Sequence, residues 1–191
     1  FSYFLIPAFY KESKIKTALI NQISDRYDIK IEFNEKVKYG LFPKPFFYTK
    51  NLDIKFNEKV IAHSEHVKFY ISFNNFFLSE NISPKNLVFQ ETEFNINSNN
   101  INFLLKTLNT SDKENQFIFK KSKLFYKDQN DDLLFLSKIK DFRFFYDELN
   151  TFQKVKSDFE IFNIPFKLDI SKNVINENKI IKLTSKKIRL D

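Results

Sequence analysis

One stretch of the chain, residues 29–73, alternates apolar and polar residues over long runs and contains the only glycine among 191 residues. Successive side chains of a β-strand point to opposite faces, so this alternation predicts strands with one apolar and one polar face. Gly40 is followed by Pro43 and Pro45. A glycine free to adopt a positive φ, next to residues that donate no ladder hydrogen bond, predicts a bend between two strands.

Two strands of this stretch are expected to pair as a hairpin. The turn between them is Asn57-Glu58-Lys59, although it lacks the glycine that tight hairpin turns favour. The apolar side chains on one side of the two strands are Leu52, Ile54 and Phe56, and Val67, Phe69, Ile71 and Phe73.

The same layout recurs twice further along the chain. The second pair joins Lys123–Tyr126 to Leu133–Tyr146 through a polar turn at Lys127–Asp132, and the third joins Asp158–Ile170 to Lys179–Leu190. Strict alternation marks the third pair at Ile164, Phe166, Leu168 and Ile170. Repeated hairpins predict a sheet that grows along one axis. Helical interruptions are expected only at Asn74–Ser79 and Asn99–Asn109.

A helix is predicted before the first strand, over Lys14–Tyr27. Ile15, Leu19 and Ile23 recur at the i, i+4 and i+8 spacing of an apolar helical stripe, and Ser13 is a suitable N-cap. We expect this stripe to cover one end of the sheet. The alternative is a helix that lies on a membrane surface.

The expected fold class is mostly β with a few short helices (α+β). We expect a curved antiparallel sheet of repeated hairpins whose apolar face, supplied with 26 phenylalanines, lines an open groove. The alternative is ordinary packing of these side chains in a core. The candidate groove residues are Leu52, Ile54, Phe56, Val67, Phe69, Ile71, Phe73, Ile164, Phe166, Leu168 and Ile170.

Several segments in one order carry a family resemblance. They are Pro7 after an apolar stub, the helix at Lys14–Tyr27, the bend Gly40-Leu41-Phe42-Pro43, the strand patterns at Asn51–Ile54 and Ile61–Phe69, the turn Asn75–Leu78 and the strand Ile82–Ile96. This order resembles the N-terminal region of the AsmA family, envelope proteins of Gram-negative bacteria related to TamB and to bridge-like lipid-transfer proteins. The resemblance covers about half of the chain, from Pro7 to Ile96.

The resemblance implies a periplasmic protein that is anchored in the inner membrane of a Gram-negative bacterium. Its expected role is phospholipid transport toward the outer membrane and outer-membrane biogenesis, with acyl chains in the groove. The expected partners are phospholipid, the inner membrane through an N-terminal anchor, and other envelope proteins. The alternative is a β-rich protein-interaction module of the envelope that binds no lipid.

The start of the chain is apolar but short. Residues 1–10, FSYFLIPAFY, fall well below the roughly 20 apolar residues that cross a bilayer. Because the chain contains no methionine, even at position 1, we expect a fragment of a longer protein. Residues 1–12 are interpreted as the remnant of a membrane anchor, and residues 13–191 as one AsmA-like β-groove domain.

The chain is basic, with a formal net charge of +7 and a pI of about 9.3. A basic balance suits anionic partners such as lipid headgroups or nucleic acid. However, Lys, Asn, Ile and Phe all have AT-rich codons, and a biased genome would give the same charge. No nucleic-acid partner is expected. Binding through interleaved Lys and Phe is an alternative that a steep salt dependence would favour.

Catalytic chemistry has little support in the sequence, and no cofactor or enzymatic activity is expected. A single glycine excludes the phosphate loops and the nucleophile elbow. His63 and His66 are spaced to face opposite sides of a strand, so a shared metal would need a local bulge. Asp128, Asn130 and Asp132 imitate a calcium loop but lack its glycine and final glutamate, which favours a hairpin turn. Glu91 and Glu93 share a strand face and are expected to be solvated.

Overall fold

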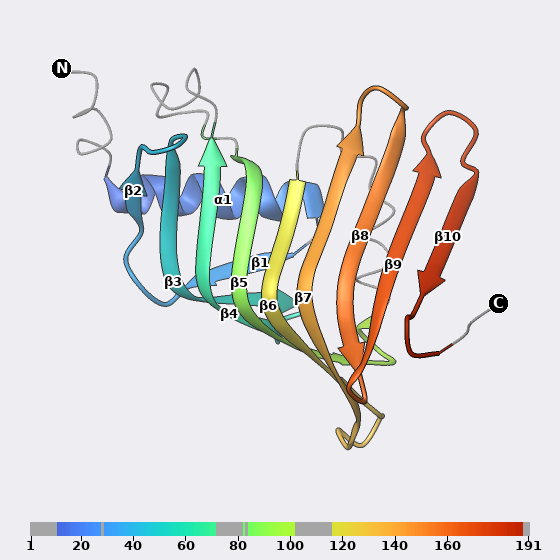
Figure 1. Cartoon of the computed structure of the whole chain (residues 1–191). Coiled ribbons are helices and arrows are strands. Elements are labelled where there is room, and N and C mark those ends of the chain that lie inside the picture. The colour runs from blue at the N-terminus through green and yellow to red at the C-terminus, as the bar shows by residue number, and fades with distance from the viewer. Residues whose placement is uncertain (1–10, 28, 72–81, 83, 102–115, 189–191) are drawn as a thin grey trace.

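The backbone forms one open, curved sheet with a single helix against one side, as Figure 1 shows for the described part of the chain. The computed structural model describes residues 11–27, 29–71, 82, 84–101 and 116–188. The ten strands follow the order β1-β3-β4-β5-β6-β7-β8-β9-β10, and β2 pairs with β3. The predicted fold class, mostly β with a curved sheet of repeated hairpins, is confirmed.

The strands lengthen toward the middle of the sheet. They are β1 (Lys30–Phe33), β2 (Lys38–Gly40), β3 (Phe46–Phe56), β4 (Lys59–Ile71), β5 (Pro84–Asn97), β6 (Gln116–Lys127), β7 (Leu133–Asp147), β8 (Phe152–Ile161), β9 (Ile164–Asn173) and β10 (Lys179–Thr184). All neighbours are antiparallel except β5 and β6, which are parallel. The expectation of an antiparallel sheet was wrong for that pair, because a long connection at 98–115 lets the chain enter β6 in the direction of β5. Of the expected helix at Asn99–Asn109, Ile101 is helical and residues 102–109 lie outside the described residues. The expected helix at Asn74–Ser79 lies wholly outside them.

Helix α1 (Glu12–Tyr27) lies against one face of the sheet, which we call the inner face. Its stripe of Ile15, Leu19 and Ile23 is 0–5 % exposed, which confirms the predicted helix and its apolar side. Ser13 is not the cap. The helix begins at Glu12, and the carbonyl of Lys11 accepts the first turn's hydrogen bonds.

The two-residue turns of the sheet use left-handed backbone without glycine. Asn57 and Glu58 have φ of 48° and 62° and join β3 to β4, which confirms that predicted hairpin. Phe162 and Asn163 have φ of 51° and 61° and join β8 to β9. The expectation of one strand over Asp158–Ile170 was therefore wrong, because this second turn divides it. At Asp128 the carboxylate accepts the N–H groups of Asn130 and Asp132, so the predicted polar turn is confirmed.

Gly40 lies in the predicted bend, but its φ is not positive. It is the last residue of β2 and pairs with Phe46 at the start of β3. A Cβ built on Gly40 would lie 2.3 Å from the ring of Phe46. That ring contacts Tyr48 and Tyr70 at centroid distances of 5.9 and 5.5 Å. Glycine is thus required here by close packing and not by backbone conformation.

A kink crosses the sheet in one straight row. Asn51, Glu65, Glu91, Lys121 and Lys140 lie in register on β3 to β7, and at each of them the ladder pairing is interrupted and then resumes in the same register. Three of them, Asn51, Glu91 and Lys121, have φ of 50–55°. The row ends at β8, where the register shifts between Ile139 and Asp141 of β7. We call these five residues the kink row, and the long strands change direction along their length (Figure 1).

The kink row reverses the alternation of side chains in every strand that it crosses. In β5, Phe89 and Thr92 are both buried toward α1, so Gln90 and Glu91 both point to the opposite, outer face. A normal strand would send two adjacent side chains to opposite faces. The inner face therefore continues through the bend, with Ser64, Thr92 and Ser122 buried among its apolar side chains, and the outer face gains a doubled row of polar groups.

Buried hydroxyl groups satisfy the backbone beside the kink row. Thr92 donates its hydroxyl hydrogen to Ser64 Oγ at 3.0 Å, and Ser64 donates to the carbonyl of Gln90 at 3.3 Å. The Ser122 hydroxyl accepts the N–H of Thr92 at 3.3 Å and donates to the carbonyl of Lys120 at 3.1 Å. Buried polar groups need such partners, so this chain of hydroxyls stabilises the interrupted ladder.

Replacing Gly40 with alanine should lower the free energy of unfolding by about 1–3 kcal/mol, because the new methyl group overlaps the Phe46 ring. Chemical denaturation measures the change. In a Phe46→Ala background the same substitution should cost far less, and an equal cost in both backgrounds would show that Gly40 acts through its backbone.

Replacing Thr92 with valine keeps the shape of the side chain but removes the hydroxyl that donates to Ser64. Because this site is fully buried, we expect a loss of about 1–3 kcal/mol in stability. Thr184→Val on exposed β10 is the matched control and should change stability by less than about 0.5 kcal/mol. Equal effects would mean that the hydroxyl chain does not support the kink.

Candidate functional site

The inner face is mostly apolar, and its buried core extends from the N-terminal strands to Val155 of β8, which is 4 % exposed. Leu52, Ile54, Val67, Phe69 and Ile71 of the predicted groove are 0–4 % exposed. They form one cluster with the apolar stripe of α1. The structure places these five side chains in the core, as the alternative of ordinary core packing expects, and none is exposed enough to line an open groove.

The remaining groove candidates lie nearer the open edge or outside the described residues. Ile164, Phe166, Leu168 and Ile170 of β9 are all partly exposed on the inner face, and of these four Ile170 packs against the core cluster. Phe56 is partly buried against the core, and Phe73 lies outside the described residues. The candidate site is therefore the C-terminal half of the predicted groove.

Six apolar side chains on the inner face of β8 to β10 lie on adjacent strands and form a surface, which we call the open wall. Its members are Phe159, Phe166, Leu168, Ile170, Ile181 and Leu183. They stand in cross-strand pairs, with Phe159 stacked on Phe166 at 5.6 Å and with Leu168 and Ile170 opposite Leu183 and Ile181. Ile170 packs against the core cluster, whereas Ile181 is 60 % and Leu183 is 44 % exposed. The wall thus extends the core surface to the free edge of the sheet.

Strand β10 ends the described sheet with an exposed edge. All six of its residues are exposed, and in the described part of the chain it pairs only with β9. Neither a bulge nor a proline interrupts β10, and such an edge can accept another strand. The sequence predicted a strand from Lys179 to Leu190, whereas β10 ends at Thr184.

A hollow of about 350 Å³ lies at the end of β7 and β8. Its apolar lining includes Leu133, Leu134 and Phe162, which are 54 %, 54 % and 74 % exposed. Lys138 and Glu160 add a charge of each sign to the lining. A hollow of this size is at the lower limit for small-molecule sites, so the open wall is the larger candidate surface.

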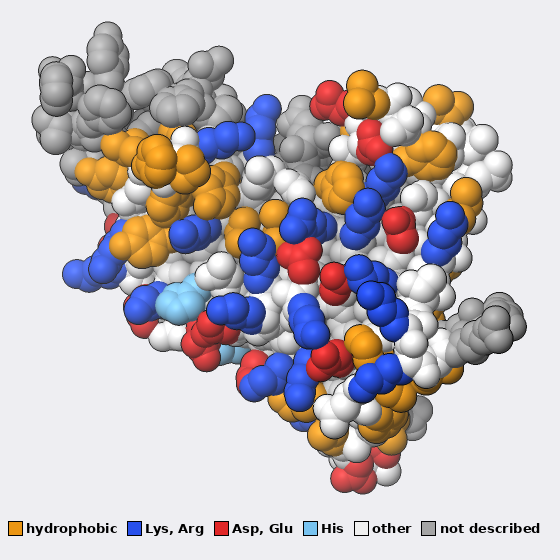
Figure 2. All heavy atoms as spheres, viewed as in Figure 1, with side chains coloured by type: hydrophobic (Ala, Val, Ile, Leu, Met, Phe, Trp, Pro, Cys, Tyr) orange, Lys and Arg blue, Asp and Glu red, His pale blue; other side chains and the backbone are white. Residues whose placement is uncertain are grey.

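The outer face carries many charged side chains, and it also holds an aromatic cluster of Phe46, Tyr48 and Tyr70. Figure 2 shows Lys and acidic side chains interleaved across the front of the sheet. Lys123 Nζ lies 2.8 Å from Glu93 Oε1, and the hydrogen bond to Glu93 raises the pKa of Lys123. Lys140 pairs with Glu160 at 2.8 Å and lowers the pKa of that carboxyl. Surface pairs of this kind keep a face soluble and add little stability.

Asp53 on this face is paired with a histidine. His63 Nδ1 lies 2.6 Å from Asp53 Oδ1. Partial burial alone would raise the pKa of Asp53, but the hydrogen bonds from Asn34 and His63 outweigh it, and the pKa of Asp53 is lowered.

His63 and His66 both point to the outer face, so the expectation that they face opposite sides was wrong. The reason is the kink row, because the extra residue Glu65 shifts the alternation between them. Glu91 and Glu93 share the outer face as predicted, and Glu93 is paired with Lys123. The local bulge that a metal shared by His63 and His66 would need is present, but among the described residues His66 is grouped with Glu65 and Glu91 and not with His63.

In comparisons with known proteins, no protein-family model matches this chain and no curated protein sequence matches it. Within the described residues, no helix is both long and apolar enough to span a bilayer. The predicted anchor remnant at residues 1–12 falls almost entirely outside those residues.

The division between core and open wall has a measurable consequence. Phe69→Ala should lower the free energy of unfolding by about 3–5 kcal/mol, because Phe69 is fully buried under α1. Phe166→Ala removes a partly exposed ring and its stacking on Phe159, so it should cost only about 1 kcal/mol. Urea denaturation of both variants tests this, and similar losses would mean that the wall is part of the sealed core.

Proposed function

We propose that this chain is an AsmA-like lipid-transport protein that holds phospholipid acyl chains on the open wall. The main support is that the inner face runs from a core covered by α1 to the exposed apolar side chains of Ile181 and Leu183. An apolar surface of this extent gains free energy when it leaves water.

The chemistry of the proposal is burial without a covalent step. An acyl chain that lies along the open wall gains about 0.8 kcal/mol for each CH₂ group that leaves water. The cross-strand pairs of β8 to β10 place apolar side chains next to one another, with Ser157 of β8 as a polar neighbour opposite Leu168. The charged outer face keeps the other side of the same strands in water.

The cellular setting of the proposal rests on the family resemblance. The protein would be anchored in the inner membrane, extend into the periplasm and carry phospholipid toward the outer membrane, in support of outer-membrane biogenesis. Helix α1 would close the trough at its membrane-proximal end, since it follows the segment that we interpret as an anchor.

A second candidate function is protein docking at the edge of β10. The exposed edge residues Lys179–Thr184, with three large apolar side chains at Ile180, Ile181 and Leu183, favour it. In this alternative, an envelope protein adds a strand to the sheet and the wall becomes part of a protein interface.

Photo-crosslinking in the intact envelope tests the lipid proposal. A crosslinking amino acid at Leu168 or Ile181 on the open wall should capture phospholipid, detected by mass spectrometry of the purified adduct. The same amino acid at Lys167, which lies between Phe166 and Leu168 but points to the outer face, should capture none.

Two results would contradict the lipid proposal. Equal capture at Lys167 and Leu168 would show contact with bulk membrane and not with the wall. Capture of protein but never of lipid at Ile181 would favour docking at the β10 edge.

A further inference from the structure

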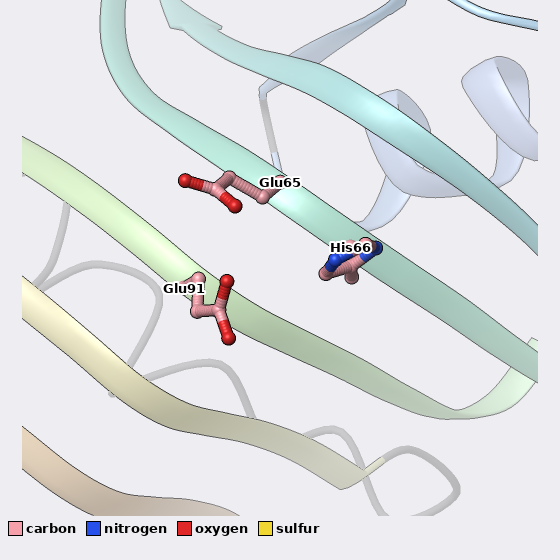
Figure 3. Close-up of side chains that lie close together, drawn as sticks. All are labelled: Glu65, His66 and Glu91. Carbon is pink, nitrogen blue, oxygen red and sulfur yellow. The ribbon is translucent and has the colours of Figure 1, made fainter.

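The kink row brings three metal-ligating side chains together on the outer face. Glu65 and His66 are adjacent in β4 and both point outward, and Glu91 lies opposite Glu65 on β5. One ligand atom from each of the three lies within 4.8 Å of the other two. Figure 3 shows the three side chains on these neighbouring strands. A regular pair of strands would turn one of the two adjacent residues to the inner face.

Two neighbouring groups on this face, Lys123 and His63, already have partners, whereas the two carboxylates have no ion pair within the described residues. Lys123, whose charge also reaches Glu65, is hydrogen-bonded to Glu93 at 2.8 Å. His63 is held by Asp53 at 2.6 Å. The chain carries a net charge of +7, yet Glu65 and Glu91 lie close together with like charge. A bound cation would remove that repulsion.

The donor set identifies the kind of cation. Two carboxylates alone would suit Ca²⁺ or Mg²⁺, but an imidazole nitrogen favours zinc and its neighbours in the transition series. Zinc accepts imidazole nitrogen and carboxylate oxygen at about 2.0–2.2 Å, which puts ligand atoms about 3.4 Å apart in a tetrahedral site. Glu65 and Glu91 are exposed and His66 is half-buried, so small rotamer changes can close the remaining gap.

We propose that Glu65, His66 and Glu91 bind one Zn²⁺ ion that links β4 to β5 at the kink row. Three protein ligands leave a fourth position for water or a further ligand. Because the ligands come from both sides of the interrupted ladder, the ion replaces the missing backbone pairing on the outer face. Binding to the folded state alone also raises stability. This site is independent of the lipid proposal, since it lies on the opposite face from the open wall.

The two histidines of the chain provide an internal comparison within the unmodified protein. In a titration of chelator-treated protein with ZnCl₂ at neutral pH, the ring signals of His66 in an NMR spectrum should shift and saturate at one ion per chain. The ring signals of His63 should move little, because its Nδ1 is already bound to Asp53. Calorimetry should give the same stoichiometry, and Ca²⁺ should not compete at equal concentration.

Matched variants separate this site from general binding to surface acids. His66→Ala and Glu91→Gln should each weaken Zn²⁺ binding by more than about 10-fold, since they remove direct ligands. His63→Ala and Glu93→Gln alter the same two residue types on the same two strands and should leave the affinity unchanged within about 2-fold. Circular dichroism of each variant confirms that the sheet is intact.

Several outcomes would overturn the proposal. They are the absence of saturable Zn²⁺ binding in the unmodified protein, a larger shift at His63 than at His66, and equal affinity in Glu91→Gln and Glu93→Gln. The NMR titration uses the unmodified protein, so it tests Zn²⁺ binding at His66 even if one of the variants fails to fold.

Discussion

The structure depends on a row of extra residues that crosses five strands in register. Where one strand alone carries a bulge, its pairing is disturbed locally, but here β3 to β7 all insert a residue at the same level, and pairing resumes unchanged on both sides. The whole sheet bends along this line. Buried hydroxyls such as Thr92 and Ser122 supply the hydrogen bonds that the interrupted ladder lacks. The bend gives α1 a concave surface to lie against, and it aligns Glu65 with His66 on the opposite face.

The inner face also has two parts that differ in exposure to solvent. Near the N-terminus, α1 and the bent strands enclose Leu19, Leu52 and Phe69, all 0 % exposed, so the hydrophobic effect there stabilises the fold. Beyond Val155 of β8, which is still buried, the same face becomes partly exposed on β9, and Ile181 and Leu183 of β10 are exposed. A surface with the composition of a core but the exposure of a binding face is the physical basis of the proposed lipid function.

The sequence predicted the strands, the helix and the curved sheet well, because alternation and helical spacing are local signals. It did not predict which part of the groove is sealed, since burial of Leu52 or Phe69 depends on where α1 packs. The kink row has a weak signal in the sequence: in β5, two polar residues, Gln90 and Glu91, separate Phe89 from Thr92 where strict alternation allows one. The parallel pair of β5 and β6 follows from a long connection, and no local pattern encodes it. The role of Gly40 was misjudged because close contact with Phe46 is a tertiary feature.

The central claim is that one apolar face is closed at α1 and open to acyl chains at β8 to β10. Paramagnetic broadening of side-chain methyl signals by a spin-labelled phospholipid tests it most directly, since methyl groups report on both parts of the face at once. The account predicts strong broadening at Leu168, Ile181 and Leu183 and little at Leu19 and Leu52. Equal broadening at all five positions, or none at the three wall positions while the protein stays folded, would contradict it.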